Sequence, residues 1–251
     1  MIKELITRGF ARTIESYPDN AIVQKQISQK LSNLVSNYKA IIPSEILEIG
    51  CGTGFLTSEL LKLYPNSNWT VNDINKEVKE SIDFLFQEKS FKKPTYLFED
   101  AEKSIFPLQY DLIITSSCLQ WFTDPKTFLA SISKKLKNDG LLAFSTFGSQ
   151  NMQEIRAITT QGLKYYSIDD YTTMLSENYE VIYCAEDTVT LCFDEPTEVL
   201  KHLKATGVNG AFRQHWTKSH LATFIANYNT LLTEQGFPLT YHPIYFICKP
   251  L

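Results

Sequence analysis

The stretch over residues 46–54, which reads Ile-Leu-Glu-Ile-Gly-Cys-Gly-Thr-Gly, constrains the fold of this chain more than any other. Its apolar first half predicts a buried strand over 46–49, and a helical pattern begins after Gly54 and continues over 55–63. Glycine is needed where a backbone adopts positive φ or passes close to a ligand. The helix that follows directs free N–H groups toward the turn. The stretch therefore predicts a nucleotide-sized cradle at the carboxyl end of a strand.

The spacing of the glycines separates two kinds of cradle. A dinucleotide-binding turn reads G-x-G-x-x-G, and this pattern fails because Phe55 stands three positions after Gly52. The pattern present, E-x-G-x-G-x-G, resembles the first motif of the class I S-adenosylmethionine-dependent methyltransferases. The resemblance implies S-adenosylmethionine as cofactor, with Glu48 helping to hold its ammonium group. It implies further cofactor contacts at Gln24, Gly50, Cys51, Gly52, Gly54, Ile74, Ser116 and Leu119.

An acidic residue follows the second predicted strand, over 69–72. This residue, Asp73, lies roughly 20 residues beyond the glycines, a separation at which a carboxylate accepts hydrogen bonds from the ribose hydroxyls of an adenosine. Alternatively, Asp73 caps the helix that begins near Lys76. A third predicted strand, over 95–98, is followed by Asp100 and Ala101. The resemblance implies that Asp100 accepts a hydrogen bond from the adenine amino group and that Ala101 donates a backbone N–H to the ring.

Strands and helices alternate as in a doubly wound α/β fold. The pattern further predicts a helix over 77–88, a strand over 110–115, a helix over 125–136 and, after a turn at 137–140, a strand over 141–146. The almost continuous apolar run at 110–115 is typical of a central parallel strand. Ligands of such folds bind beyond the carboxyl ends of the strands. This rule gathers residues 50–54, 73, 100, 116–121 and 146–148 on one rim.

The pattern changes after Gly148. Helices are predicted over 152–164 and 168–177, and one long strand each over 179–193 and 240–248, the last inserted antiparallel. Between these strands, residues 194–236 predict a helical insertion with helices over 197–204 and 218–234. An amphipathic helix over 23–38 belongs to a segment, residues 1–40, that we expect to close over the cofactor as a lid. We predict one domain over 1–251, with a doubly wound, mostly parallel seven-stranded sheet of the class I methyltransferase type and a helical cap insertion.

Composition limits the classes of function. The 251 residues are 43% hydrophobic and 21% charged, as in ordinary soluble globular proteins, and the net charge of −4 argues against a general nucleic-acid binder. The five dispersed cysteines include no C-x-x-C pair, which is typical of a reducing compartment. Neither a secretory signal nor an apolar run of membrane-spanning length is visible, so we expect a soluble, cytoplasmic protein. The four histidines are not spaced as metal ligands, and no metal site is predicted.

Several later segments resemble the malonyl-acyl carrier protein O-methyltransferases of biotin synthesis, and the resemblance extends over nearly the full chain. The matching segments are 17–24, 119–122, 142–148, 204–209 and 239–243. Thr-Gly-Val-Asn at 206–209 is the more specific marker, whereas Leu-Gln-Trp at 119–121 also occurs in the trans-aconitate methyltransferases. One departure, Asn-Asp-Gly at 138–140, falls at a predicted surface turn. The resemblance implies methyl transfer from S-adenosylmethionine to the free carboxylate of a malonyl thioester on acyl carrier protein.

This reaction needs no general base, because a carboxylate with a pKa of about 4 is ionised at neutral pH. Positioning and the exclusion of water should therefore supply most of the catalysis. Tyr17, Trp121 and Phe147 are candidates for the aromatic walls of such a pocket. Arg213 is our first candidate to pair with the malonyl carboxylate, and Arg156 is the second.

The insertion carries candidates for a carrier-protein surface. Acyl carrier proteins are strongly acidic, so a basic face should steer them. Lys201, His202, Lys204, Arg213 and Lys218 supply such a face, or they are ordinary solvated charges on amphipathic helices. Other functions stay open: methylation of another small carboxylic acid or of a coenzyme A thioester, and a cofactor-binding regulatory protein without turnover. Nucleic-acid methylation is disfavoured because no Asn/Asp-Pro-Pro-Tyr-type motif is present.

Overall fold

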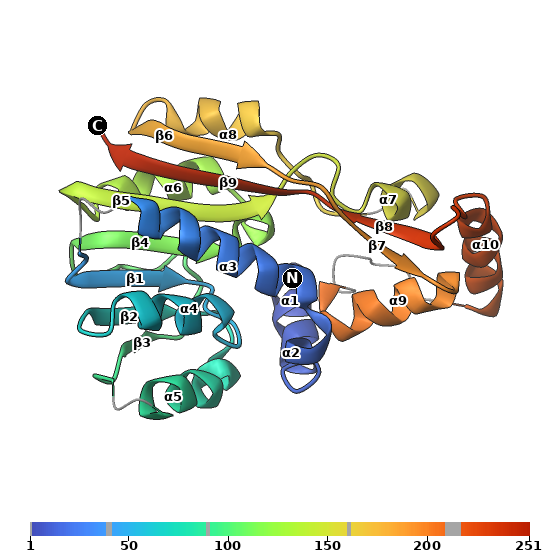
Figure 1. Cartoon of the computed structure of the whole chain (residues 1–251), viewed down its shortest axis with the longest axis horizontal. Helices are drawn as coiled ribbons and strands as arrows, with labels where there is room; N and C mark the ends of the chain where they lie inside the picture. Colours follow the sequence, from blue (N-terminus) through green and yellow to red (C-terminus); the bar gives the residue numbers. More distant parts are fainter. Residues whose placement is uncertain (1, 39–41, 89–90, 160–161, 209–216) are drawn as a thin grey trace.

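The structure is a computed structural model that describes residues 2–38, 42–88, 91–159, 162–208 and 217–251. Its centre is a seven-stranded sheet with the order β3-β2-β1-β4-β5-β9-β6 (Figure 1). The strands are β1 (Glu45–Ile49), β2 (Asn68–Asn72), β3 (Thr95–Leu97), β4 (Tyr110–Ser116), β5 (Leu136–Phe147), β6 (Tyr179–Glu186) and β9 (Pro243–Pro250). Strands β1 to β5 are parallel, and β9 lies antiparallel between β5 and β6. The predicted sheet, with its last strand inserted antiparallel, is confirmed.

Helices cover both faces of this sheet because both faces of its central strands are apolar. Successive residues of a strand point to opposite faces. Thus Ile46 and Ile114 belong to one buried cluster, and Leu47 and Ile113 belong to the other. The first cluster includes residues of α3 (Ile22–Asn37), α4 (Phe55–Leu63) and α5 (Lys79–Glu88), the last preceded by the 3-10 helix η1 (Lys76–Val78). The second includes residues of α6 (Pro125–Ser133) and α8 (Ile168–Leu175).

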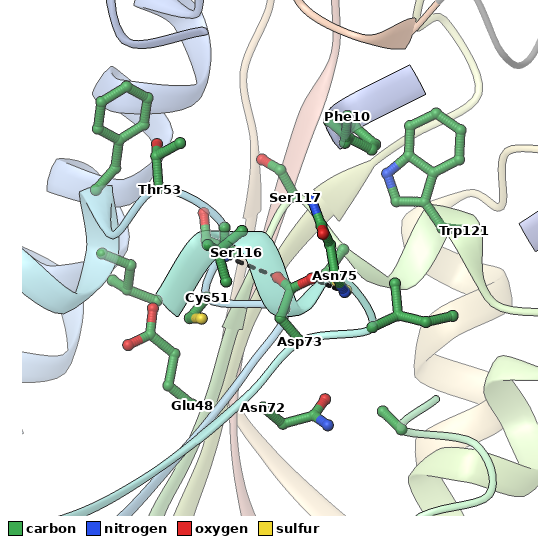
Figure 2. A pocket seen from close by; sticks show the side chains of 18 of the residues that line it. Phe10, Glu48, Cys51, Thr53, Asn72, Asp73, Asn75, Ser116, Ser117 and Trp121 are labelled. Carbon is green, nitrogen blue, oxygen red and sulfur yellow. Dashed lines mark hydrogen bonds between the residues drawn. The ribbon is translucent and has the colours of Figure 1, made fainter. Parts of the chain in front are cut away.

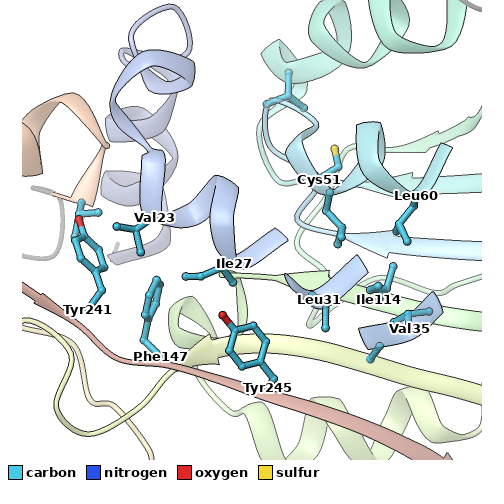
Figure 3. Packing of buried hydrophobic residues seen from close by; sticks show 14 of the residues in the cluster. Val23, Ile27, Leu31, Val35, Cys51, Leu60, Ile114, Phe147, Tyr241 and Tyr245 are labelled. Atoms are coloured by element: carbon cyan, nitrogen blue, oxygen red, sulfur yellow. The ribbon is translucent and has the colours of Figure 1, made fainter. Parts of the chain in front are cut away.

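Helix α3 shows how the sequence pattern produces this packing. Its buried residues recur every three or four positions, so they form one stripe that faces Ile114 and Tyr245 of the sheet (Figure 3). The stripe consists of Val23, Ile27, Leu31 and Val35. Each of these side chains stabilises the fold by roughly 1.5–3 kcal/mol on burial. The predicted amphipathic helix is confirmed, and it fixes the segment that precedes β1.

The long strands predicted over 179–193 and 240–248 are wrong, because each is broken into two. Strand β7 (Val189–Phe193) follows β6, and β8 (Phe237–Tyr241) precedes β9, so that β7 and β8 form a separate two-stranded sheet. The break before β9 lies at His242. Its carbonyl accepts from Gly148 N–H at 2.7 Å, one position beyond the last β5–β9 pair, and its backbone N–H donates to the side chain of Asn151, at 3.2 Å from Oδ1.

The remaining elements surround one end of the main sheet. Helices α9 (Pro196–Ala205) and α10 (Lys218–Asn229) connect β7 to β8, and α7 (Gln153–Thr159) follows β5 (Figure 1). Helices α6, α7 and α10 end earlier than predicted, and β5 begins earlier, at Leu136. Two N-terminal helices, α1 (Ile2–Ala11) and α2 (Tyr17–Asn20), and the 3-10 helix η2 (Leu119–Trp121) complete the chain. Among the described residues, no helix has both the length and the apolar character to cross a membrane.

Candidate functional site

A cavity opens at the carboxyl ends of β1, β2 and β4, and residues of α1 and α2 form part of its wall (Figure 2). It encloses about 1180 Å³, part of which is open to solvent. We call it the first cavity. Most of the predicted site residues line it: Tyr17, Gln24, Glu48, Gly50, Cys51, Gly52, Asp73, Ile74, Asp100, Ala101, Ser116 and Trp121. The rule that ligands of such folds bind beyond the carboxyl ends of the strands, which we call the strand-end rule, therefore grouped residues that lie far apart in the sequence but line one cavity.

The glycine turn is held against the end of β2. The N–H groups of Gly50 and Cys51 both donate to the carbonyl of Asn72, at 2.8 and 3.0 Å. Gly50 has a φ of 66°, and a Cβ at this position would lie 2.4 Å from Sγ of Cys118, so no larger residue fits without a shift. Gly52 has a φ of 52°, and a Cβ there would meet no atom within 4 Å. The turn thus presents bare backbone to the cavity at Gly52.

Asp73 connects this turn to the end of β2. Its Oδ2 accepts a hydrogen bond from Gly52 N–H at 2.9 Å, and its Oδ1 accepts one from Asn75 N–H at 2.8 Å. Burial raises the pKa of Asp73, and these N–H donors oppose the shift. The cap of η1 is Asn75, whose Oδ1 accepts from Glu77 N–H at 3.0 Å. The capping alternative for Asp73 is therefore wrong, whereas its contact with ribose stays a prediction.

Glu48 is buried at the floor of the first cavity, with 1% of its surface exposed. Its Oε2 accepts a hydrogen bond from the Thr57 hydroxyl at 2.7 Å. The pKa of Glu48 is raised to about 8, because burial, together with the neighbouring charge of Asp73, outweighs the hydrogen bonds from Thr57 that lower it. A buried carboxyl of this kind ionises when a positive group approaches, because the opposite charge offsets the cost of desolvation. The ammonium group of a bound ligand would be such a positive group.

The carboxylate of Asp100 is occupied by a lysine from the N-terminal helix. Lys3 Nζ donates to Asp100 Oδ1 at 2.5 Å and also pairs with Glu102, while it lies 5.4 Å from the centroid of the Phe122 ring. Lys3 itself lines the first cavity. Helix α1 is thereby tied across the end of the cavity at which Asp100 lies.

Several predicted residues lie outside this lining or outside the described part of the chain. Gly54 packs on α5 instead, since a Cβ there would lie 2.4 Å from Leu85 Cδ1. Leu119 is 1% exposed and belongs to the second buried cluster. Arg213 lies outside the described residues, as does His215. Arg156, the second candidate for the carboxylate, donates to the carbonyl of Ser149 and lines neither the first cavity nor the one described next.

A second, smaller cavity adjoins the first. The two share Phe10, Tyr17, Gln24, Ser117 and Trp121 as lining residues. The rest of the second cavity is lined by Gln120, Phe147, Asn151, Met152, Leu163, Tyr165, Thr206, Val208 and Tyr241. The three predicted aromatic walls, Tyr17, Trp121 and Phe147, therefore meet at this cavity. No charged side chain among the described residues lines it.

The polar atoms of the first cavity fit a cofactor with a cationic end, hydroxyl groups and an aromatic ring. Gln24 Oε1, Thr53 Oγ1, Asn75 Nδ2 and Ser117 Oγ are buried without a hydrogen-bond partner. Because buried polar atoms are normally partnered, bound ligands are the natural partners for these four, and Ser117, which lines both cavities, can meet a ligand in either one. The buried acid Glu48 suits an ammonium group, and Ile74, which is 42% exposed at the cavity, offers an apolar surface for a ring. The residues present thus fit S-adenosylmethionine.

Sequence reasoning missed several lining residues, chiefly Lys3, Ser117, Asn151 and Tyr165. A signal existed for Ser117, which lies within the predicted rim segment 116–121. Asn151 follows the rim segment 146–148 by three positions, in a polar turn that carried no distinguishing pattern. Nothing in the sequence placed Lys3 beside Asp100.

The insertion reaches the second cavity through its marker sequence. Thr206 and Val208 line the cavity, and a Cβ on Gly207 would lie 2.8 Å from Cδ1 of Phe10. Asn209 lies outside the described residues. Lys201, Lys204 and Lys218 are exposed on α9 and α10.

His202 does not belong to a basic face, which corrects the prediction. Its Nε2 is 2.8 Å from the hydroxyl of Tyr241, and burial lowers its pKa, so the ring is neutral at neutral pH. His242 is 4% exposed and lies 3.2 Å from Glu186 Oε2. Across the described ranges, no group of three or more His, Cys, Asp or Glu could hold a metal ion.

Comparison with known proteins agrees with this geometry. The family model described as "Methyltransferase domain" matches residues 47–142. Two solved structures share the fold. YcgJ of Bacillus subtilis aligns with a TM-score of 0.62 at 16% identity, covering 88% of this chain and 97% of its own. The N-methyltransferase NodS of Bradyrhizobium japonicum, solved with S-adenosylhomocysteine, has a TM-score of 0.57 at 15% identity and covers 98% of both chains.

Relatives with higher identity carry one common name, malonyl-[acyl-carrier protein] O-methyltransferase. The protein of Bacteroides thetaiotaomicron is 37% identical, covering 99% of this chain and 98% of the relative, and that of Haemophilus influenzae is 35% identical, covering 98% and 94%. The relative from Bacteroides fragilis is 39% identical over 98% of this chain, which spans only half of that longer protein. The chain belongs to the malonyl-[acyl-carrier protein] O-methyltransferase family of methyltransferases.

Proposed function

We propose that this protein transfers a methyl group from S-adenosylmethionine to the free carboxylate of malonyl-acyl carrier protein. The observation that carries the proposal is the union of two cavities at Tyr17, Gln24 and Ser117. The first has the buried acid Glu48, the partly buried Asp73 and unpartnered polar atoms that suit the cofactor. The second is aromatic, and no described residue that lines it is charged. A donor in the first cavity would thus meet an acceptor in the second. Full-length relatives that are named for this reaction support the assignment.

Each part of the cofactor has a candidate partner. Glu48 would hold the ammonium group and ionise on doing so, and Asp73 would accept hydrogen bonds from the ribose hydroxyls. Asp100, Ala101 and Ile74 would surround the adenine. S-adenosylmethionine, when bound, supplies a methyl group on a positively charged sulfur that departs as a neutral thioether.

The acceptor is ready for reaction without a base. An oxygen of the malonyl carboxylate donates its electron pair to the methyl carbon as the bond from that carbon to sulfur breaks, and no proton moves. The protein's part is to align the two groups and to exclude water from the carboxylate. The opposite charges of the two reactants neutralise one another during transfer. An apolar pocket with walls such as Trp121 and Phe147 therefore favours the transition state over the separated ions.

The carrier protein would approach over α9. This helix exposes Lys201 and Lys204 on its outer surface, and the chain just beyond its end lines the second cavity at Thr206. Neither lysine makes an ion pair with any residue of the described part of the chain. The arrangement offers an acidic carrier a positive surface close to the acceptor pocket. Methylation hides the charged end of the malonyl group, so that chain elongation toward the pimeloyl precursor of biotin can follow, in a cytoplasmic setting.

Transfer of labelled methyl groups tests the proposal directly. The acceptors to compare are malonyl-acyl carrier protein, malonyl-coenzyme A, free malonate and acetyl-acyl carrier protein. We expect transfer to the malonyl carrier to be the most efficient and transfer to the acetyl carrier to be absent. Preference for malonyl-coenzyme A or another free acid would support the alternative acceptor. Binding of S-adenosylhomocysteine without transfer to any acceptor would support a regulatory protein instead.

A further inference from the structure

The turn over residues 148–152, directly after β5, is fastened to the link between β8 and β9. Gly148 N–H donates to the carbonyl of His242 at 2.7 Å, and Met152 N–H donates to the carbonyl of Thr240 at 2.7 Å. Gln150 N–H donates to Nδ1 of His242 at 3.1 Å. Such bonds on both sides hold the turn in one position. A side chain that it carries into the second cavity is therefore preorganised.

Asn151 is that side chain. It is fully buried, and its Oδ1 accepts the backbone N–H of His242 at 3.2 Å. Because a backbone N–H can only donate, this bond settles which end of the amide is the oxygen. The other end, Nδ2, is buried without a hydrogen-bond partner, and Asn151 lines the second cavity. A buried N–H group without a hydrogen-bond partner destabilises the ligand-free protein. It therefore points to a bound ligand that accepts a hydrogen bond from this group.

A second unpartnered group lies on the same cavity. The hydroxyl of Ser117 is buried without a partner, and Ser117 lines both cavities. Ser117 has a φ of 53°, and Met152, the neighbour of Asn151, has a φ of 51°. Within the described residues, these are the only two besides glycines with positive φ. Such conformations are unfavourable and persist mainly at functional sites. Ser117 thus has positive φ and an unpartnered hydroxyl, and Met152, which also has positive φ, directly follows Asn151 with its unpartnered Nδ2. All three residues line the second cavity.

Among the described residues, none of the side chains that line the second cavity around these donors is charged. Burial raises the pKa of Tyr165 to about 12, although the nearby Asn151 amide and the charge of Arg156 oppose the shift, so its hydroxyl keeps its proton at neutral pH. The Asn151 amide nevertheless makes no hydrogen bond of normal geometry to this hydroxyl. Arg156 lies behind this ring, with its guanidinium carbon 5.6 Å from the ring centroid, and it does not line the cavity. A carboxylate that enters would therefore meet neutral donors of hydrogen bonds. Hydrogen bonds from such donors replace those that the carboxylate loses when water is excluded. Because the donors are neutral, the carboxylate oxygen that attacks the methyl group keeps more negative charge than it would beside a guanidinium.

We propose that Nδ2 of Asn151 and the hydroxyl of Ser117 bind the malonyl carboxylate and orient it for methylation. One oxygen accepts these hydrogen bonds, and the other is left to accept the methyl group. The inference rests on the proposed function and deepens it, because it names the residues that distinguish a malonyl group from an acyl group without a carboxylate. It gives neutral donors a role that the sequence analysis assigned to an arginine, of which the first candidate, Arg213, lies outside the described residues.

The test compares two carriers in the presence of saturating S-adenosylhomocysteine. Dissociation constants are measured for malonyl-acyl carrier protein and acetyl-acyl carrier protein, and separately for S-adenosylhomocysteine alone. Asn151→Asp keeps an oxygen for His242 N–H but replaces the amide donor with a second acceptor. We expect it to weaken binding of the malonyl carrier by about tenfold or more, and to leave the acetyl carrier and S-adenosylhomocysteine within about twofold of wild type. Ser117→Gly, which tolerates positive φ, should shift binding in the same direction.

Gln150→Glu is the matched control. It makes the same amide-to-acid change one residue earlier, on an exposed side chain that lines neither cavity. It should bind both carriers as the wild type does. Equal weakening in Gln150→Glu, or equal loss of both carriers in Asn151→Asp, would overturn the assignment and leave the proposed reaction standing. A wild-type protein that fails to distinguish the malonyl carrier from the acetyl carrier would count against the proposed function itself.

Discussion

Oδ2 of Asp73 lies 2.9 Å from the backbone nitrogen of Gly52, so the carboxylate expected to bind ribose also holds the glycine turn in place. The second oxygen is fixed by Asn75 N–H at 2.8 Å. The carboxylate is therefore oriented before a ligand arrives, and less conformational freedom is lost when one binds. One residue thus has two roles, as a ligand contact and as a support for the turn, and suitable variants can separate them.

Asp73→Ala should weaken binding of S-adenosylhomocysteine by about 10- to 100-fold, because each lost charged hydrogen bond costs about 1.5–3 kcal/mol. Asp73→Asn keeps an oxygen that can accept Gly52 N–H, so its loss should be smaller. Calorimetric titration of the ligand-free protein measures both. Asp169→Ala, on the exposed surface of α8, serves as the control and should bind normally. Unchanged affinity in Asp73→Ala would contradict the ribose contact.

Glu48 gives the ligand-free protein a pH dependence of known sign. Burial raises its pKa from 4.5 to about 8 in the folded protein, so the folded state binds this proton more tightly than the unfolded chain does. Its contribution to stability is therefore complete below about pH 4.5 and is lost as the pH rises to about 8. Glu48→Gln can still accept the Thr57 hydroxyl and does not titrate. Between pH 5 and 8, the wild type should lose unfolding free energy relative to this variant, by at most about 1.4 kcal/mol per pH unit.

Urea denaturation at a series of pH values measures this difference. The two proteins share every other titrating group, so the background pH dependence cancels in the comparison. Curves that stay parallel from pH 5 to 8 would show that Glu48 is already ionised in the folded protein. The burial argument for an ammonium site would then lose its basis.

The parts of the site that depend on local chemistry could be predicted from the sequence. Gly50 and Gly52 stand where positive φ is required, and Asp73 follows the end of a strand, so each position follows from short-range patterns and the strand-end rule. The positions of Lys3 and Asn151 could not be predicted in this way. Lys3 reaches a partner 97 residues away, and Asn151 reaches one 91 residues away. No periodicity encodes such contacts.

The broken strands and the burial of His202 also depend on contacts between residues far apart in the sequence, which the local sequence pattern does not encode. Residues 179–193 are divided at Asp187 and Thr188, where the chain changes its partner strand from β9 to β8, and this change depends on contacts with residues far along the sequence. His202 lies among lysines in the sequence and was therefore expected to be charged and exposed. Its contact with Tyr241 is tertiary, and the resulting burial lowers its pKa.

Lys3 should hold α1 against the rim of the first cavity. Its side chain is 24% exposed and pairs with Asp100 and Glu102. Lys3→Met keeps the length of the side chain and removes the charge. Because partly exposed ion pairs contribute up to about 1 kcal/mol, amide hydrogen exchange in Ile2–Ala11 should become up to about fivefold faster. Mass spectrometry of the ligand-free protein detects the change.

Lys103→Met is the control for this prediction. Lys103 Nζ also lies 4.0 Å from Asp100, but its side chain is 84% exposed, so its removal should leave α1 unchanged. Exchange in α3 should not respond to either variant, since α3 is fixed by its buried stripe. If Lys3→Met leaves exchange in α1 unchanged, the helix is held by the contact of Phe10 with Trp121, whose ring centroids are 5.5 Å apart.

Reversal of charge on α9 tests the route of the carrier protein. The double variant Lys201→Glu/Lys204→Glu should lower kcat/KM for malonyl-acyl carrier protein by about tenfold at low salt, because an acidic partner is then repelled where it was attracted. The rate on malonyl-coenzyme A, a much smaller anion, should fall less than the rate on the carrier-bound substrate. The matched control is Lys92→Glu/Lys93→Glu, which makes the same change of charge before β3, at the amino-terminal edge of the sheet.

A salt series separates steering from damage to the fold. Attraction between exposed charges falls as the Debye length shortens from about 10 Å at 0.1 M to about 3 Å at 1 M. The difference between wild type and Lys201→Glu/Lys204→Glu should therefore shrink as salt rises, whereas a distorted second cavity would impair transfer at every salt concentration. An equal rate on the carrier at low salt would mean that these lysines are ordinary solvated charges. The carrier would then have to approach the second cavity over another surface than α9.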